Sequence, residues 1–290
     1  MKIGSFFPVR LAGTAALVFA LFSLTLTSCK QDGETLAEDD LELAEQDAQV
    51  EAVFDDVESY GVEAMELFDG TSFQRPFAGV HFFNQVFPNG CPVITHDTAA
   101  KVITVDFGPG CTGPHGRVYA GEIIVNYTQR LYRPGAVLTV TLDSFYVDGA
   151  HIEGTKTITN VSPNFQAPIS LNTVLAGGQV TWPDGSTATR SFNRTSTWLR
   201  APNPAADQLT VSGSATGVRR NGTAYTMTIT TPLVYKRACR IQGIRMAVEG
   251  ERLIQRSGKP DVTVNFGTGD CDELITVTVN GNSQVIDLGN

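Results

Sequence analysis

Apolar and polar side chains alternate along most of the chain after residue 73. In KVITVDF, residues 101–107, the side chains of Ile103, Val105 and Phe107 fall on one face. The same period of two recurs in EIIVNYT, VLTVTLDSF, AYTMTIT, IRMAVEG and LITVTVNGN, which begin at residues 122, 137, 224, 244 and 274. Such alternation is typical of antiparallel strands with one buried face and one solvated face.

Tight-turn dipeptides separate several of these segments. They are Asn89-Gly90, Asp148-Gly149, Asp184-Gly185, Asn221-Gly222 and Asn280-Gly281. Asn or Asp followed by Gly tolerates the positive φ that a two-residue hairpin requires. The pattern predicts a mainly β domain over residues 71–290, with antiparallel hairpins and meanders in a sandwich or in one large twisted sheet. Within it, HFFNQVF at 81–87 is apolar on both faces, which predicts a fully covered strand.

The segment from residue 34 to residue 68 has the strong helical pattern of the chain. Val50, Val53, Phe54 and Val57 have the spacing i, i+3, i+4, i+7, which places them on one face of a helix. Acidic residues fill most of the remaining positions. A helix docked through its valine face, or a charged stalk, fits this pattern.

We expect residues 29–44 to form an acidic linker and residues 45–70 to form an amphipathic acidic helix. The acidic side chains are expected to face solvent. Gly61 weakens the helical pattern, so the helix is expected to break there.

The N-terminus has the features of an export signal. An uncharged apolar run over 11–26 follows two basic residues, and LTSC ends at Cys29. This stretch resembles the lipobox of bacterial lipoproteins, in which a leucine stands three positions before the cysteine. The resemblance implies that residues 1–28 are a cleaved signal peptide and that Cys29 is acylated, with two or three chains for stable membrane anchoring. A plain signal peptide, cut elsewhere with Cys29 incidental, is the alternative.

The formal net charge of -9 belongs to the N-terminal segment. Residues 30–70 hold fifteen acidic residues against one lysine, whereas residues 71–290 hold fifteen acidic residues against eighteen basic ones. The main domain is therefore slightly basic. Because no basic run is interleaved with aromatic residues, we do not expect a nucleic-acid partner.

Four cysteines remain if Cys29 is acylated, namely Cys91, Cys111, Cys239 and Cys271. An even number in an oxidising compartment predicts two disulfides, with three possible connectivities. We favour Cys91–Cys111 and Cys239–Cys271 because each pair flanks a short β unit. A zinc site is the alternative, but the chain has no C-x-x-C and its histidines are scattered.

The sequence contains no recognisable nucleophile–base motif. The remaining candidates for catalytic or metal chemistry are two sets of acidic residues. Asp143 and Glu153 could face each other across a hairpin, as the carboxylates of a glycosidase do at about 5 to 9 Å. Asp270, Asp272 and Glu273 could hold calcium together with backbone carbonyls. Solvated strand and loop positions explain both groups more simply. We therefore predict no catalytic residue, metal site or cofactor.

Aromatic residues close to arginines are the main indication of a ligand. The candidates are Trp182, Trp198 and Tyr132. Aromatic rings on an exposed sheet can stack on sugar faces, and arginine can stack on the rings. Cross-strand pairing that stabilises the sheet is the competing explanation.

The order of these features is similar to that in a group of Bacteroidota lipoproteins with strand-rich bodies. After the lipobox and the acidic helix come TVDFGPGCTGPHGR at 104–117, EGTKTITN at 153–160, NGTAYTMTITTPL at 221–233, and then Cys239. The resemblance covers nearly all of the mature chain. It implies an envelope location and a β-rich body, and it carries no activity across.

We expect a lipid-anchored protein of the outer membrane, at its surface or its periplasmic face. The first hypothesis is a binding or structural module whose partners are the lipid bilayer and a glycan or another envelope protein. The second is a polysaccharide-acting hydrolase whose carboxylates the sequence does not reveal.

Overall fold

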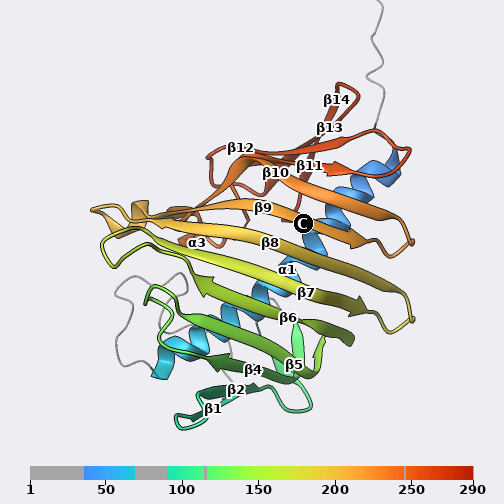
Figure 1. Ribbon diagram of the computed structural model, residues 1–290. Coiled ribbons are helices and arrows are strands. Elements are labelled where there is room, and N and C mark those ends of the chain that lie inside the picture. The colour runs from blue at the N-terminus through green and yellow to red at the C-terminus, as the bar shows by residue number, and fades with distance from the viewer. Residues whose placement is uncertain (1–35, 69–89, 114–115, 245, 290) are drawn as a thin grey trace, which may run out of the picture. The chain divides into compact units, whose positions relative to one another are not determined.

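The computed structural model describes residues 36–68, 90–113, 116–244 and 246–289 (Figure 1). The predictions about the signal peptide, Cys29 and the covered strand at 81–87 lie outside these residues. The described residues form a long helix, α1, over Glu38–Phe68 and one antiparallel sheet. Its strands are β1 Val93–Asp97, β2 Val102–Asp106, β3 Cys111–Thr112, β4 Val118–Tyr127, β5 Val137–Val147, β6 Ala150–Asn160, β7 Ile169–Thr181, β8 Thr187–Leu199, β9 Gln208–Val218, β10 Ala224–Lys236, β11 Glu249–Gln255, β12 Val262–Thr268, β13 Leu274–Val279 and β14 Asn282–Asp287.

Neighbouring strands of the sheet follow one another along the chain. The order runs from β1 through β2 and β4 to β14, and the two-residue β3 pairs beside β4. The colour in Figure 1 accordingly changes steadily from green to red across the sheet. The predicted mainly β fold of antiparallel hairpins is confirmed, in the form of one large sheet. Among the described strands, β1 and β14 are its two edges.

Most short connections of the meander lie at one end of the sheet and most long ones at the other, and the exceptions are β1–β2, β2–β4 and β12–β13. At the end termed here the turn end, connections of two to six residues join β5–β6, β7–β8, β9–β10, β11–β12 and β13–β14. At the opposite end, termed the loop end, eight to twelve residues join β4–β5, β6–β7, β8–β9 and β10–β11. Four of the five predicted tight turns lie at the turn end, where Asp148 and Gly149 have φ of 52° and 81°, and Asn89 of the fifth is outside the described residues. Asn280 and Gly281 likewise have φ of 50° and 83°.

Helix α1 begins earlier than the expected helix over residues 45–70. It begins at Glu38, so the expected linker over residues 29–44 is wrong in its last part. Leu43 and Ala44 are fully buried in the core, which favours helix over extended linker there. Burying one leucine side chain stabilises a fold by roughly 1.5–3 kcal/mol.

The helix runs without interruption through Gly61, so the predicted break is also wrong. A Cβ at Gly61 would lie 3.2 Å from Cγ2 of Val140 and 3.4 Å from Cγ2 of Val125. Because glycine has no side chain, α1 can approach β4 and β5 closely at this point. This packing outweighs the cost of glycine in a helix, which is about 1 kcal/mol relative to alanine.

The main apolar core lies between α1 and one face of the sheet. Val50, Phe54 and Val57 of α1 are buried in one cluster with Ile103 of β2 and Ile123 of β4. The helix is therefore docked through its valine face, as one of the two interpretations of the pattern predicted. The stalk alternative is wrong for the described part of the helix.

Both favoured disulfides are present. Cys91, before β1, is bonded to Cys111 of β3, with the two Cα atoms 6.0 Å apart. Cys239, in the short helix α3 over Arg237–Ile241, is bonded to Cys271 between β12 and β13, with a Cα separation of 4.9 Å. The predicted connectivity is confirmed, and these four thiols are not available to the zinc alternative.

Candidate functional site: the charged layer between α1 and the sheet

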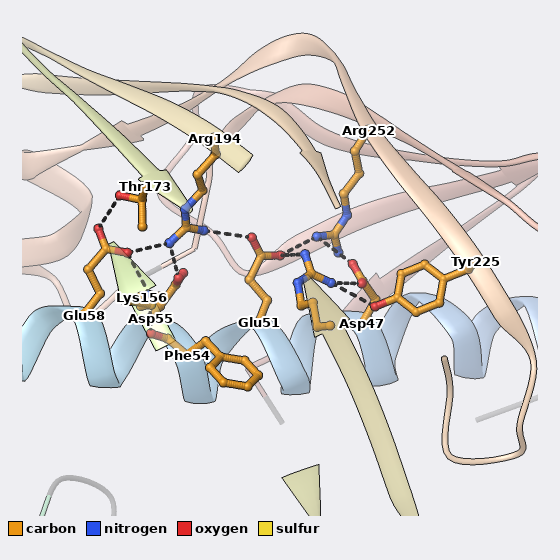
Figure 2. Close-up of polar contacts among 11 residues, drawn as sticks. Asp47, Glu51, Phe54, Asp55, Glu58, Lys156, Thr173, Arg194, Tyr225 and Arg252 are labelled. Atoms are coloured by element: carbon orange, nitrogen blue, oxygen red, sulfur yellow. Dashed lines mark hydrogen bonds and ion pairs between the residues drawn. The ribbon is translucent and has the colours of Figure 1, made fainter. Parts of the chain in front are cut away.

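Acidic side chains of α1 point at the sheet and meet basic side chains there (Figure 2). The acidic members are spaced by four, four and three residues, so they share one face of the helix. The prediction that the acids of α1 face solvent is wrong for them. The set, termed the charged layer, is Asp47, Glu51, Asp55 and Glu58 of α1, Lys156 of β6, Arg190 and Arg194 of β8, and Arg252 of β11.

The first half of the layer centres on Asp47. Its carboxylate pairs with Arg190, and its Oδ2 lies 3.1 Å from Nη1 of Arg252. The same nitrogen of Arg252 donates to Oε2 of Glu51 at 2.7 Å. Arg190 also donates from Nη1 to the hydroxyl of Tyr225 at 3.1 Å. Two arginines from different strands therefore share two carboxylates of one helix.

The second half of the layer centres on Arg194. Its guanidinium contacts Oε1 of Glu51 at 3.3 Å and Oε2 of Glu58 at 3.1 Å, and it also pairs with Asp55. Lys156 donates from Nζ to the same oxygen of Glu58 at 2.8 Å. Glu51 thus belongs to both halves, and the layer is one connected network.

Further charged contacts hold the start and the middle of the helix. Near the start of α1, Asp39 accepts from Nη1 of Arg219 at 2.6 Å and from Nη1 of Arg256 at 2.6 Å. These arginines lie in the β9–β10 and β11–β12 connections, so α1 begins at the turn end. Later in the helix, Asp56 pairs with Arg117, just before β4, at 3.1 Å. The helix therefore crosses the sheet from its C-terminal strands to its N-terminal strands.

The electrostatics keep Glu51 and Glu58 ionised. Burial favours the neutral form of Glu51, but the three surrounding arginines outweigh it and lower its pKa to about 2. Burial acts in the same way on Glu58, where Lys156 and Arg194 lower the pKa to about 2. Both carboxylates therefore carry a full negative charge at neutral pH.

Asp55 and Lys156 are the less well compensated members of the layer. Burial raises the pKa of Asp55 despite the opposing charge of Arg194, and the negative charge of Glu51 adds to the rise. Burial lowers the pKa of Lys156, and Glu58 opposes that shift. Keeping Asp55 and Lys156 charged in the folded protein therefore costs free energy.

The layer is closed to solvent at its centre, which decides what it can do chemically. The side chains of Arg190 and Asp47 are each 1% exposed, so a substrate has no access to them. Buried ion pairs require good geometry to offset their desolvation, and removing one partner costs about 3–5 kcal/mol. The layer therefore sets the position and register of α1 on the sheet.

Comparison with protein-family models, curated proteins and solved structures finds no match to this chain. Among the described residues, no helix is both long enough and apolar enough to cross a membrane. The charged layer and the predicted site residues are thus the features from which a function can be inferred.

The three aromatic candidates do not form one surface. Trp182 directly follows β7, whereas Trp198 pairs with Ile169 at the beginning of β7, so the tryptophans lie at opposite ends of this hairpin. Trp198 is 3% exposed, and Arg200 covers its ring with the guanidinium carbon 4.7 Å from the ring centroid. Tyr132 lies in the β4–β5 connection.

Arginines contact the other two aromatic residues as well. The guanidinium carbon of Arg220 lies 4.6 Å from a ring centroid of Trp182. Nη1 of Arg130 donates to the hydroxyl of Tyr132 at 3.5 Å. Two of these three contacts join residues only two positions apart, so they are not the cross-strand pairs of the competing explanation, and stacking on a sugar stays a prediction.

The predicted carboxylate pair is divided between separate partners. Asp143 accepts from Oγ of Ser144 at 3.1 Å, and Glu153 accepts from Nε2 of Gln179 at 3.1 Å. Ser144 and Glu153 border a shallow hollow on β5, β6 and β7, which Asp143 does not line.

In the part of the chain that the structure describes, no three His, Cys, Asp or Glu side chains gather closely enough to hold a metal ion.

Proposed function

We propose that this protein is a lipid-anchored binding or structural module of the cell envelope, attached to the outer membrane through acylated Cys29. The lipobox-like sequence before Cys29 supports the anchor. The observation that carries the proposal is the charged layer, because it fastens the segment that follows Cys29 to the body. Helix α1 begins at Glu38 and is held by ion pairs from Asp39 to Glu58.

A tethered module needs a firm connection between its anchor and its body. An apolar helix face alone can slide or rotate on a sheet, whereas paired charges at fixed positions define one register. Glu51 contacts arginines of both β8 and β11, so the helix is tied to two separate strands. This arrangement suits a helix that transmits the position of the anchor to the sheet.

The outer face of the sheet over β8 to β10, on the side away from α1, fits a module better than a hydrolase. Along β8, side chains of the buried face alternate with uncharged hydroxyl and amide side chains. The latter are Thr189, Ser191, Asn193, Thr195 and Thr197. The row continues across neighbouring strands, since Asn193 pairs with Ser214 and Ser214 with Thr228. This part of the face can bind or pack. Carboxylates lie opposite each other elsewhere on the same face, since Glu122 of β4 pairs with Asp106 of β2 and with Asp143 of β5.

The anchor is tested by expressing the full chain and its Cys29→Ala variant in a Gram-negative host with a clickable palmitate analogue. We expect the wild-type chain to be labelled and to sediment with membranes. The variant should be unlabelled and released by export into a soluble fraction. Ser257→Ala, an exposed change in the β11–β12 connection, is the matched control and should behave as wild type. Retention of the label by Cys29→Ala would refute the proposal.

A further inference from the structure

We infer that the turn end of the sheet faces the lipid bilayer and that the loop end points away from it. The inference rests on the proposed acylation of Cys29 and adds the orientation of the body on the membrane. Two features carry it, namely the place where α1 joins the sheet and the length of chain between that place and Cys29.

The start of α1 is fixed at the turn end. Asp39 bonds to Arg219 in the β9–β10 connection and to Arg256 in the β11–β12 connection. Both arginines are buried, and Arg256 also pairs with Asp40, which is 8% exposed. Leu36, before the helix, packs against the core as well. The chain therefore enters the body at the turn end, and Leu36 marks its point of entry.

The chain before Leu36 is short compared with the sheet. Seven residues lead from Cys29 to Leu36, and a fully extended chain of that length spans at most about 25 Å. Strands β7, β8 and β10 each contain 13 residues, which corresponds to about 44 Å at 3.4 Å per residue. With the loop end on the bilayer, Leu36 would be held about 40 Å from the surface, farther than this chain reaches.

The two ends differ in their exposed side chains. Exposed residues of the β9–β10 and β11–β12 connections, such as Arg220 and Lys259, are polar and suit contact with lipid headgroups. At the loop end, Phe165 of the β6–β7 connection is 69% exposed and Ile241 of the β10–β11 connection is 70% exposed. These exposed side chains do not by themselves choose between the two orientations, and the inference rests on where the chain enters the body and on its length.

The orientation is tested on the mature, acylated protein in phosphatidylcholine vesicles that carry a quencher on some lipid headgroups. A fluorophore is attached at Ser257→Cys in the β11–β12 connection or at Gln166→Cys in the β6–β7 connection. Both positions are exposed, and the native disulfides stay intact. We expect severalfold stronger quenching at position 257 than at position 166. Equal quenching, or stronger quenching at position 166, would overturn the orientation.

Two controls separate this inference from the proposed function. Co-sedimentation with vesicles reports anchoring by itself, and failure of the acylated protein to bind would overturn the proposed function and the orientation together. A flexible Gly/Ser insertion of about twenty residues between Lys30 and Leu36 lengthens the connection. It should keep binding but collapse the difference between the two labels. A difference that survives the insertion would show that chain length does not set the orientation.

Discussion

Arg190 of β8 and Asp47 of α1 form an ion pair in which each side chain is only 1% exposed. They are 143 positions apart in the sequence. Because water cannot replace either partner at this depth, each charge depends on the other. The pair joins the helix to a central strand, so its loss should destabilise the whole domain.

Asp47→Ala should lower the free energy of unfolding by about 3–5 kcal/mol, because Arg190 and Arg252 would then lose a shared buried carboxylate. Urea denaturation at neutral pH measures the change. Glu45→Ala, on the exposed side of the same helix, is the matched control and should shift stability by less than about 0.5 kcal/mol. Similar small effects of both substitutions would mean that the layer does not stabilise the fold.

Stability should fall in acid because of Glu51 and Glu58. Each has a folded pKa of about 2 against an ordinary value of 4.5. Their contribution is therefore fully present above pH 4.5 and is lost as the pH falls toward 2, by roughly 3 kcal/mol for each group. Urea unfolding at a series of pH values measures the decline. Glu51→Gln and Glu58→Gln should flatten it, and an unchanged slope in both variants would contradict the assignment.

Asp55 should respond in the opposite direction. Its pKa is raised, so ionisation in the folded state costs stability as the pH rises through the folded pKa. Removing the charge with Asp55→Asn should therefore cost less at neutral pH than Glu51→Gln does. The two variants can be compared by urea unfolding under identical conditions. A larger loss for Asp55→Asn would show that its pairing with Arg194 outweighs its burial.

The sheet could be predicted because the sequence patterns that specify its strands and turns lie close together in the chain. Each strand pairs with a neighbour in the chain, and the Asp148-Gly149 dipeptide marks one of the turns that make this possible. The two disulfides were predictable for the same reason, since each joins segments that flank a short β unit. The lipid anchor at Cys29 stays a prediction.

The charged layer was not predictable in the same way, because it joins helix and strand residues far apart in the sequence. A signal was nevertheless present. On β8, Arg190 lies between Ala188 and Phe192 on the face that alternation assigns to the core. A buried arginine needs an acidic partner. The acids from Asp47 to Glu58 have a spacing that places them on one face of the helix, which marks them as candidate partners.

A soluble form that begins near residue 45 should be markedly less stable than one that begins at Lys30. The shorter form lacks fully buried Leu43, and it leaves Arg219 and Arg256 without Asp39. A loss of several kcal/mol corresponds to a decrease in Tm of about 10 °C for a domain of this size. Thermal unfolding followed by circular dichroism measures it. Equal Tm values for the two forms would show that the first turns of α1 contribute nothing to the fold.

Gly61→Leu should destabilise the protein even though leucine is a far better helix former than glycine. Already at the Cβ position, a side chain would meet Val140 at 3.2 Å and Val125 at 3.4 Å, so leucine must push α1 away from β4 and β5. Overpacking of this kind typically costs about 1–3 kcal/mol. Ala52→Leu, an exposed change on the same helix, adds similar volume without this contact and should be close to neutral. Urea denaturation of both variants separates the two effects, and a stabilising Gly61→Leu would show that helix propensity, not close approach, governs this position.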